Sequence, residues 1–293
     1  MDHSTGDGKT MNKSIADALS VAIDVAHEAG LRGIQAVPLR STNNVVAWLS
    51  PSPIVAKVGY GRLACLQTEL QVAIELSSVG GPVVSPASEI PAIVHSRRGL
   101  DVTFWRYHPQ QADLAINEAA VAVALRRLHA AMSGISPTLR STLPSFLQEL
   151  ESARSLLADA ARIPALPEVD RLLLANTLDQ LKTDLLELAP ARSHAVIHGS
   201  PHFHNVLLVG EKAVFIDFET TCTGPIEWDL AHMAEEVEVA YGAAVNERLM
   251  WICRGMASVK TAAFCWADVD RGDLREHAEG HLSHVRESVA PYL

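Results

Sequence analysis

The sequence predicts an α+β protein with a β-rich N-terminal lobe and a mostly helical C-terminal lobe. Short apolar segments separated by turn residues fill the chain up to residue 108, and long amphipathic helical patterns follow from residue 109. With 293 residues, of which 48% are hydrophobic and 20% charged, the chain is long enough for two packed lobes. We therefore expect a flexible tail over residues 1–13, a first lobe over 14–108 and a second over 109–293.

The first lobe is predicted to hold two β-hairpins with a helix between them, after an N-terminal helix. Apolar residues recur at helical spacing after residue 14, and Gly30 ends that pattern. An SPSP turn joins the first pair of strands, and an RRG turn joins the second. The expected helices span residues 14–30 and 62–78, and the expected strands span 45–49, 54–58, 92–95 and 101–107.

The second lobe is predicted to be helical except for one short β region. The composition changes at His108-Pro109, which marks the boundary between the lobes. A long amphipathic helix is indicated by apolar residues at helical spacing: Leu114, Val121, Leu125, Leu128 and Met132. Further helices are expected over 145–162 and 169–188, a β region over 195–218, and helices again to the end of the chain.

Composition excludes several classes of function. The net charge of −10 argues against a nucleic-acid-binding protein, although it is compatible with a cationic small-molecule partner. No apolar run approaches the ~20 residues that cross a bilayer, and the polar N-terminus does not resemble a secretory signal. The four cysteines form no C-x-x-C pair, which favours buried thiols in a reducing compartment. We expect a soluble, cytoplasmic protein whose oligomeric state the sequence leaves open.

The chemistry-bearing residues concentrate between residues 198 and 219. Residues 198–205 read HGSPHFHN, and a short predicted hairpin then leads to VFIDFE at 214–219. Asn205 enters one strand and Asp217 leaves the other, so an amide and a carboxylate lie at the same end of the hairpin. Such hard oxygen ligands suit Mg²⁺. The alternative is that both residues only cap turns.

These segments resemble the H-G-D-x-H-x-x-N catalytic loop and the I-D-[FW]-E strand of aminoglycoside phosphotransferases. The sequence GPIEWDLA at 224–231 resembles the G-[DP]-x-x-x-D-L-A element of that family, and ALRRLH at 124–129 resembles its L-x-x-L-H helix. The resemblance covers residues 34–240. It implies a bilobal protein-kinase-like fold with a five-stranded sheet in the first lobe. It also implies Mg²⁺-dependent transfer of phosphate from ATP or GTP to a hydroxyl of a small-molecule acceptor, which the sequence does not identify.

A kinase of this type needs a strand lysine that holds nucleotide phosphates and a helix glutamate that orients it. Lys57 is the one charged residue in an apolar strand segment. On the following helix, the predicted buried stripe consists of Leu63, Leu66, Leu70 and Ile74. Glu69 lies at the margin of this stripe, and Glu75 lies opposite Leu66. Glu69 is therefore the predicted partner of Lys57. The alternative is a lysine that extends its ammonium group to solvent from an edge strand.

The remaining nucleotide contacts are less specific. Residues 40–45 occupy the place of a Gly-rich loop but contain no glycine, so Ser41, Thr42 and Asn43 are the candidate phosphate ligands unless the segment is an ordinary turn. The backbone from Trp105 to Tyr107 is expected to bind the nucleotide base, unless these aromatic residues belong only to the core.

Ser200 occupies the position where the family has its catalytic aspartate, and three readings follow. A kinase without this base would be slower but could act, because phosphoryl transfer depends mostly on positioning and charge, and His202, His204 or Glu219 could serve as a base. The second reading is a pseudokinase that binds nucleotide or a small molecule without turnover. The third is a zinc hydrolase that uses His198, His202, His204 and Asp217.

The resemblance also assigns roles to four residues near this loop. It implies that His198 and Asp229 are linked by hydrogen bonds that support the loop, so that Asp229 acts as a structural anchor. Glu219 and Glu227 could hold a cationic acceptor or could be solvated charges.

Overall fold

The computed structural model describes residues 6–42, 44–110, 117–188, 194–242, 245–272 and 274–293. The chain divides into two compact units, which are Met1–Ser141 with His204–Thr221 (unit 1) and Thr142–Phe203 with Cys222–Leu293 (unit 2). Unit 1 contains the main β-sheet and unit 2 is mostly helical, as predicted. The division differs from the predicted boundary after residue 108, because residues 109–141 and the hairpin after His204 belong to unit 1.

Unit 1 is built on a five-stranded antiparallel sheet with the order β1-β2-β3-β5-β4. Its strands are β1 (Gln35–Ser41), β2 (Asn44–Ser50), β3 (Ile54–Tyr60), β4 (His95–Arg97) and β5 (Leu100–Arg106). Both predicted hairpins are present, although β4 begins three residues later than expected. Strand β1 was not predicted, because it is an exposed edge strand that contains Pro38 and carries little hydrophobic alternation.

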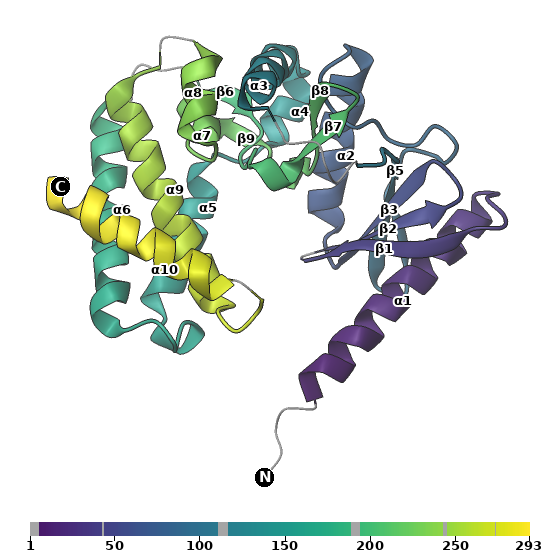
Figure 1. Cartoon of the computed structure of the whole chain (residues 1–293), viewed down its shortest axis with the longest axis horizontal. Coiled ribbons are helices and arrows are strands. Elements are labelled where there is room, and N and C mark those ends of the chain that lie inside the picture. Colours follow the sequence, from purple (N-terminus) through teal and green to yellow (C-terminus); the bar gives the residue numbers. More distant parts are fainter. Residues whose placement is uncertain (1–5, 43, 111–116, 189–193, 243–244, 273) are drawn as a thin grey trace. The chain divides into compact units, whose positions relative to one another are not determined.

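Two helices cover opposite faces of this sheet. Helix α1 (Gly6–Glu28) packs through Val21 and Val25 on the face that carries Ile54 and Val58, and Figure 1 shows it lying along β1 to β3. Because side chains alternate along a strand, the intervening Lys57 points to the other face. Helix α2 (Leu63–Ser78) contributes to the core on that other face. The helix α1 begins at Gly6, so residues 6–13 differ from the predicted flexible tail; a formed helix extends at little cost where no proline interrupts it.

The hairpin that the predicted metal ligands Asn205 and Asp217 flank joins unit 1 through backbone hydrogen bonds. Strands β7 (Val206–Val209) and β8 (Lys212–Phe215) pair antiparallel. The Phe215 N–H donates to the Pro82 carbonyl at 2.8 Å, and the Val84 N–H donates to the Phe215 carbonyl at 3.2 Å. Helix α3 (Glu118–Met132) also contacts β8, and α4 (Pro137–Thr142) follows α3 in the sequence. Leu114, predicted for the α3 stripe, lies outside the described residues.

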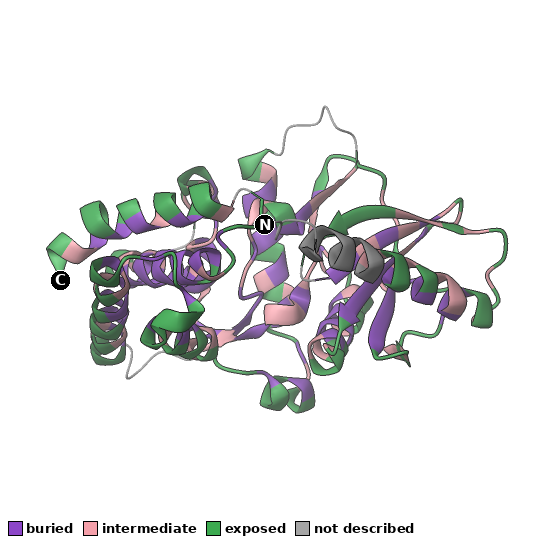
Figure 2. Ribbon diagram, turned by 90° about the horizontal axis from the view of Figure 1, so that it is seen from below, coloured by how far each residue is buried: buried purple, intermediate pink, exposed green. Residues whose placement is uncertain are grey.

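Unit 2 is organised around helix α9 (Glu247–Ala267), which is buried on most of its surface and contacts α5, α6, α7 and α10. A helix surrounded in this way is apolar on nearly all sides, which explains its many small and sulfur-containing residues. Figure 2 shows the buried residues in purple. The other helices are α5 (Leu147–Ala158), α6 (Glu168–Leu188), α7 (Ile226–Leu230), α8 (Glu235–Tyr241) and α10 (Leu274–His284). Short 3-10 or π turns are η1 (Ala160–Arg162), η2 (Phe203–Asn205), η3 (Phe218–Thr220), η4 (Val285–Val289) and η5 (Ala290–Tyr292).

A second two-stranded sheet in unit 2 supports the segment before Ser200. Strand β6 (Ala195–Ile197) pairs antiparallel with β9 (Cys222–Gly224), which was not predicted. All four cysteines are free thiols, and all except the half-buried Cys65 are buried. Across the described ranges, no helix is both long enough and apolar enough to span a membrane.

Candidate functional site

Lys57 and Glu69 form the buried ion pair that the sequence predicts. The Lys57 Nζ atom lies 2.9 Å from both carboxylate oxygens of Glu69. The buried face of α2 is rotated from the predicted stripe, because Leu63 and Ile74 are exposed while Glu69 is only 3% exposed. Glu69 therefore lies within the buried face and not at its margin. Glu75, on the other side of α2, accepts hydrogen bonds from the Ser136 backbone N–H and hydroxyl.

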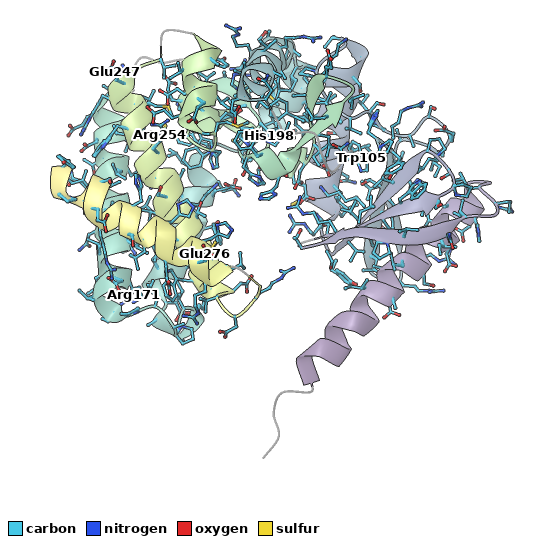
Figure 3. The ribbon with its side chains drawn as sticks, viewed as in Figure 1. Trp105, Arg171, His198, Glu247, Arg254 and Glu276 are labelled. Carbon is cyan, nitrogen blue, oxygen red and sulfur yellow. The ribbon has the colours of Figure 1, made fainter. Side chains whose placement is uncertain are left out.

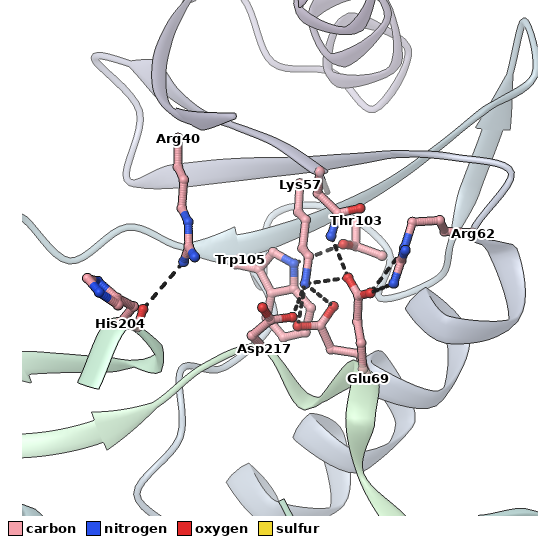
Figure 4. A network of polar contacts seen from close by, with 10 residues as sticks. Arg40, Lys57, Arg62, Glu69, Thr103, Trp105, His204 and Asp217 are labelled. Carbon is pink, nitrogen blue, oxygen red and sulfur yellow. Dashed lines mark hydrogen bonds and ion pairs between the residues drawn. The ribbon is translucent and has the colours of Figure 1, made fainter. Parts of the chain in front are cut away.

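Two further carboxylates reach the same ammonium group, and Figure 4 shows one of them, Asp217, beside Lys57. Asp217 Oδ1 lies 2.8 Å from Lys57 Nζ, and Glu219 Oε1 lies 2.7 Å from it. The three carboxylates of Glu69, Asp217 and Glu219 have oxygen atoms within 4.8 Å of one another. We call Lys57 and these three acids the lysine cluster. Its side chains come from a central strand, a helix and the turn after β8, which are distant in the sequence.

Backbone geometry at the end of β8 places Asp217 in this cluster. Asp217 has φ of +69°, a left-handed conformation that is uncommon for any residue other than glycine. The preceding Ile216 N–H donates to the Asn205 carbonyl at 3.0 Å, which closes the hairpin at the end where both predicted metal ligands lie. Asn205 is buried, whereas the Asp217 side chain is 35% exposed. Such strained conformations concentrate at functional sites.

Glu219 has partners that the sequence analysis did not anticipate. Asn44 Nδ2 donates to Glu219 Oε1 at 2.6 Å, and the Arg62 guanidinium donates to Glu219 Oε2, with Nε at 3.1 Å. Asn44 begins β2 and Arg62 precedes α2, so Glu219 links both elements to the hairpin. No sequence pattern identifies these partners, since neither residue belongs to a motif with Glu219.

The charges of the lysine cluster alter the protonation of its members. Burial lowers the pKa of Lys57, but Glu69, Asp217 and Glu219 together outweigh burial and raise it, so the ammonium remains protonated. Burial raises the pKa of Glu69 to about 7 against the opposing effect of Lys57, and the two other carboxylates add to the increase. When Glu69 is ionised, three acids face two cations with Arg62 included, which leaves one excess negative charge.

The lysine cluster borders a cavity of about 460 Å³ within unit 1. Its apolar lining comes from the sheet (Val46 and Val55), from the segment after α2 (Val84), and from β7 and the residue after β8 (Leu207 and Ile216). Lys57, Glu69 and Asp217 line the same cavity. Most ligand sites combine such apolar walls with a few convergent polar groups.

Trp105 and Tyr107 line this cavity, but their surroundings differ from the expectation for base binding. The Arg106 N–H donates to the Ser85 carbonyl at 3.0 Å, and the Tyr107 N–H donates to the Pro53 carbonyl at 2.8 Å. These two donors are therefore occupied, and the carbonyls of this segment are the groups that could meet a ligand. The Trp105 indole, labelled in Figure 3, donates to Thr103 Oγ1 at 2.9 Å.

The predicted phosphate loop is shorter than expected. Arg40 and Ser41 belong to strand β1, where they pair with Val46 and Val45. Thr42 lines the cavity, and its N–H donates to the Asn44 carbonyl at 3.1 Å. Asn43 lies outside the described residues.

In unit 2, Asp229 anchors the loop that carries Ser200. Its carboxylate accepts hydrogen bonds from the backbone N–H groups of His198, at 2.9 Å, and Gly199, at 2.7 Å. His198, labelled in Figure 3, is fully buried, and its Nδ1 accepts a long 3.4 Å hydrogen bond from the Ser200 N–H. The hydrogen bonds from His198 and Gly199 to Asp229 come from their backbone N–H groups. Gly199 has φ of +92°, which favours glycine at this position.

The other predicted site residues occupy different surroundings. His202 is half-buried in unit 2, and His204 begins the segment that joins unit 1, where its carbonyl accepts a 3.4 Å hydrogen bond from Arg40. Within the described part of each unit, no histidine belongs to a three-residue group with metal-ligand spacing, so the zinc-hydrolase reading gains no support. Glu227 is 3% exposed and accepts from the Asn246 N–H at 3.2 Å. Like the Glu219 carboxylate, the Glu227 carboxylate already accepts a hydrogen bond within the protein, which does not favour a role in binding a cationic acceptor.

The model of the phosphotransferase enzyme family (APH) matches residues 64–251. No curated protein sequence matches the chain.

Several solved structures share its fold. An amicoumacin kinase in complex with AMP-PNP, Ca²⁺ and Ami is 11% identical, with a TM-score of 0.71 over 95% of this chain and 97% of that chain. The GDP complex of aminoglycoside 2′-phosphotransferase-IIIa is 13% identical, with a TM-score of 0.67 over 94% and 99%. A choline/ethanolamine kinase family protein from Mesorhizobium loti is 19% identical, with a TM-score of 0.64 over 94% and 93%.

Proposed function

The chain belongs to the phosphotransferase enzyme family, and on that premise we propose that it transfers the γ-phosphate of ATP or GTP to a hydroxyl of a small molecule, with Mg²⁺. The observation that carries this proposal is the lysine cluster, three members of which line the unit 1 cavity. A kinase needs a lysine held by a helix glutamate and an acid that binds metal. Lys57, Glu69 and Asp217 supply these groups, and the Lys57 ammonium lies within hydrogen-bonding distance of both acids.

The apolar part of the cavity is suited to a purine base. Val55 and Leu207 could contact the two faces of a flat ring, because they come from the sheet and from the β7–β8 hairpin. Similar proteins have been solved with AMP-PNP or GDP, which supports a nucleotide here and leaves the choice of base open. The carbonyls of residues 105–107 could accept hydrogen bonds from the exocyclic amine of adenine or from N1–H and the amine of guanine.

The carboxylate oxygens of the lysine cluster fit Mg²⁺, which prefers hard oxygen ligands and retains several waters. Asp217 would hold the ion because it is the more exposed acid, with the Asn205 amide at the same end of the hairpin. The ion would supply positive charge to the phosphate oxygens. Lys57 would then turn from Asp217 to phosphate oxygens while Glu69 keeps it in place.

Ser200 sets the expected rate. A serine hydroxyl is not ionised near neutral pH, so it cannot act as the base that an aspartate provides. General-base catalysis is typically worth ~10²–10⁴-fold, which we expect to be lost unless His202 or His204 replaces it. Positioning and charge stabilisation by Lys57 and Asp217 do not depend on that base. We therefore infer a slow kinase. The alternative is a pseudokinase, which would bind nucleotide at the lysine cluster without transferring phosphate.

We assign no charge to the small-molecule acceptor. The carboxylates of Glu219 and Glu227, which could have held a cation, already accept hydrogen bonds within the protein. The net charge of −10 alone is compatible with a cationic acceptor but does not require one.

The proposal is tested first by nucleotide binding. Saturating Mg²⁺ with ATP or GTP should raise the melting temperature, because a ligand that binds only the folded state stabilises it. The Lys57→Met variant should lose most of this increase. Lys212→Met is the matched control, since Lys212 is exposed at the start of β8. No increase with either nucleotide would reject both the kinase and the pseudokinase.

Transfer is tested by incubating the protein with γ-labelled ATP or GTP and a panel of alcohols, including sugars, amino alcohols and aminoglycosides. If the wild type forms a labelled acceptor and Asp217→Asn does not, the protein is a kinase. Ser200→Asp should increase the rate if the site is a weakened kinase. Nucleotide binding without label transfer in either the wild type or Ser200→Asp would favour the pseudokinase.

A further inference from the structure

Unit 2 contains a buried lysine that the proposed chemistry does not use. Lys260 lies on the central helix α9 and is 7% exposed. Its Nζ lies 2.8 Å from Glu149 Oε2 and 3.1 Å from His232 Nε2. It also lies 5.0 Å from the centre of the Trp228 ring, a typical distance for a cation–π contact.

The neighbouring imidazole must be neutral to accept from this ammonium group. His232 Nδ1 lies 2.8 Å from the Trp228 carbonyl, which can only accept, so Nδ1 carries the hydrogen. Nε2 then has a lone pair that accepts from Lys260. Burial and the positive charge of Lys260 lower the pKa of His232 to about 3, in agreement with this assignment. His232 therefore links the lysine to the backbone of Trp228.

Trp228 is held on several sides in this arrangement. It is 1% exposed, and its ring lies 5.3 Å from that of Phe146 and 4.9 Å from that of His232, measured between centroids. Its indole Nε1–H donates to the Gly199 carbonyl at 3.0 Å. The next residue, Asp229, binds two backbone N–H groups of the same loop. Asp229 therefore binds two backbone N–H groups of the loop immediately before Ser200, and Trp228 binds one of its backbone carbonyls.

We propose that Lys260 is a positioning residue. Its ammonium group, which Glu149 and His232 hold in place, keeps the Trp228 ring in position. The Trp228 indole N–H can then donate to the Gly199 carbonyl, and this bond fixes the loop that carries Ser200. The inference rests on the proposed function only in assigning a kinetic effect to this loop. The geometric part stands on contacts within unit 2.

A purely structural role explains the lysine less well. A buried ammonium group loses its hydration, which costs several kcal/mol unless its partners compensate, and apolar residues of similar volume are often at least as stabilising. Here the lysine meets one carboxylate, one imidazole and one aromatic face: the aromatic face is Trp228 itself, and the imidazole binds the Trp228 carbonyl. A cation on the face of the indole also favours the N–H as a donor, because it draws electron density from the ring.

Hydrogen exchange of the backbone amides tests the geometric part without any substrate. In Lys260→Met, the amides of residues 198–200 should exchange at least tenfold faster than in the wild type, while amides of the α5–α6 pair change less than threefold. Lys260→Arg keeps a cation near Trp228 and should restore exchange to within threefold of the wild type. Lys182→Met is the control, since Lys182 pairs with Glu151 on the surface.

A second variant keeps the test decisive if Lys260→Met does not fold. Trp228→Phe retains an aromatic ring but removes the indole N–H, and it should produce the same local increase in exchange. Unchanged exchange at residues 198–200 in whichever of these variants folds, or an equal increase throughout unit 2, would overturn the proposal. The proposal would also be overturned if the amides of residues 198–200 exchanged as fast in Lys260→Arg as in Lys260→Met.

Steady-state kinetics test the catalytic consequence. With an acceptor that supports turnover, Lys260→Met should lower kcat about tenfold and leave the KM for nucleotide within twofold, because the nucleotide cavity is lined by unit 1 residues. An increased nucleotide KM with unchanged kcat would contradict the positioning role. If the wild type transfers no phosphate, the proposed function fails, and the exchange experiment still decides whether Lys260 fixes the loop.

Discussion

Replacement of Lys57 by methionine should destabilise the protein strongly and in a way that a cation can reverse. Lys57 Nζ lies within 2.9 Å of the carboxylates of Glu69, Asp217 and Glu219. Methionine has a similar volume, so packing changes little, but the three acids then face only Arg62. Removing one partner of a buried ion pair typically costs 3–5 kcal/mol, and we expect a loss of about 3 kcal/mol in the free energy of unfolding. The partial exposure of Asp217 keeps the estimate at the lower end.

The assay is urea unfolding followed by tryptophan fluorescence and circular dichroism at pH 8. Lys212→Met should unfold at the same urea concentration as the wild type. Millimolar Mg²⁺ or Ca²⁺ should restore a large part of the loss in Lys57→Met, because a divalent ion can replace the ammonium among the carboxylates. The double variant Lys57→Met/Glu69→Gln should be less unstable than the sum of the single variants, by about 1–3 kcal/mol.

This reasoning would be refuted if Lys57→Met were as stable as Lys212→Met in metal-free buffer. It would also be refuted if the losses in unfolding free energy of the two single variants added up in the double variant, because an ion pair between Lys57 and Glu69 requires that the two effects be coupled. Insensitivity of Lys57→Met to both metal ions would show that the three acids do not form a shared cation site.

Three further predictions concern unit 2. The pKa of His232 is lowered from 6.5 to about 3, so the neutral form favours folding above pH 6.5 and this stabilisation is lost as the pH falls. The wild type should lose about 2 kcal/mol more than His232→Asn between pH 7 and 5, and equal pH profiles in urea unfolding would contradict this. Gly199→Ala places a Cβ at φ of +92° and should cost roughly 1–3 kcal/mol of unfolding free energy or displace Ser200, with lowered turnover; an unchanged melting temperature and rate would show that the loop tolerates a different backbone. Asp229→Asn should weaken the two amide hydrogen bonds of the loop and accelerate exchange at His198 and Gly199, and protection equal to the wild type would argue against Asp229 as the anchor.

Regular periodicity and the order of motifs predicted much of the fold and the core of the site. The pairing of β2 with β3 follows from two apolar segments around a turn, and helix geometry placed Glu69 beside Lys57. Strand β1 was missed because an exposed edge strand has no buried face to impose alternation. The helix stripe was rotated because a charged residue, Glu69, occupies the buried face, which a hydrophobic pattern does not anticipate.

Contacts between segments that are distant in the sequence could not be predicted from sequence patterns. Asn44 and Arg62 meet Glu219 only after the sheet, α2 and the β7–β8 hairpin assemble, and neither residue has a local signature. The same applies to Lys260, which reads as an ordinary helix residue until Glu149 and His232 surround it. The assignment of the hairpin to unit 1 also depends on hydrogen bonds to residues 82–84, which no pattern reveals.

Isothermal titration of the wild-type protein with MgATP and MgGTP tests the central claim most directly. We predict binding of one nucleotide per chain that requires the divalent ion and weakens at least tenfold in both Lys57→Met and Asp217→Asn, with Lys212→Met unchanged. Heat of binding that is absent for both nucleotides, or that persists undiminished in the two cluster variants, would contradict the account.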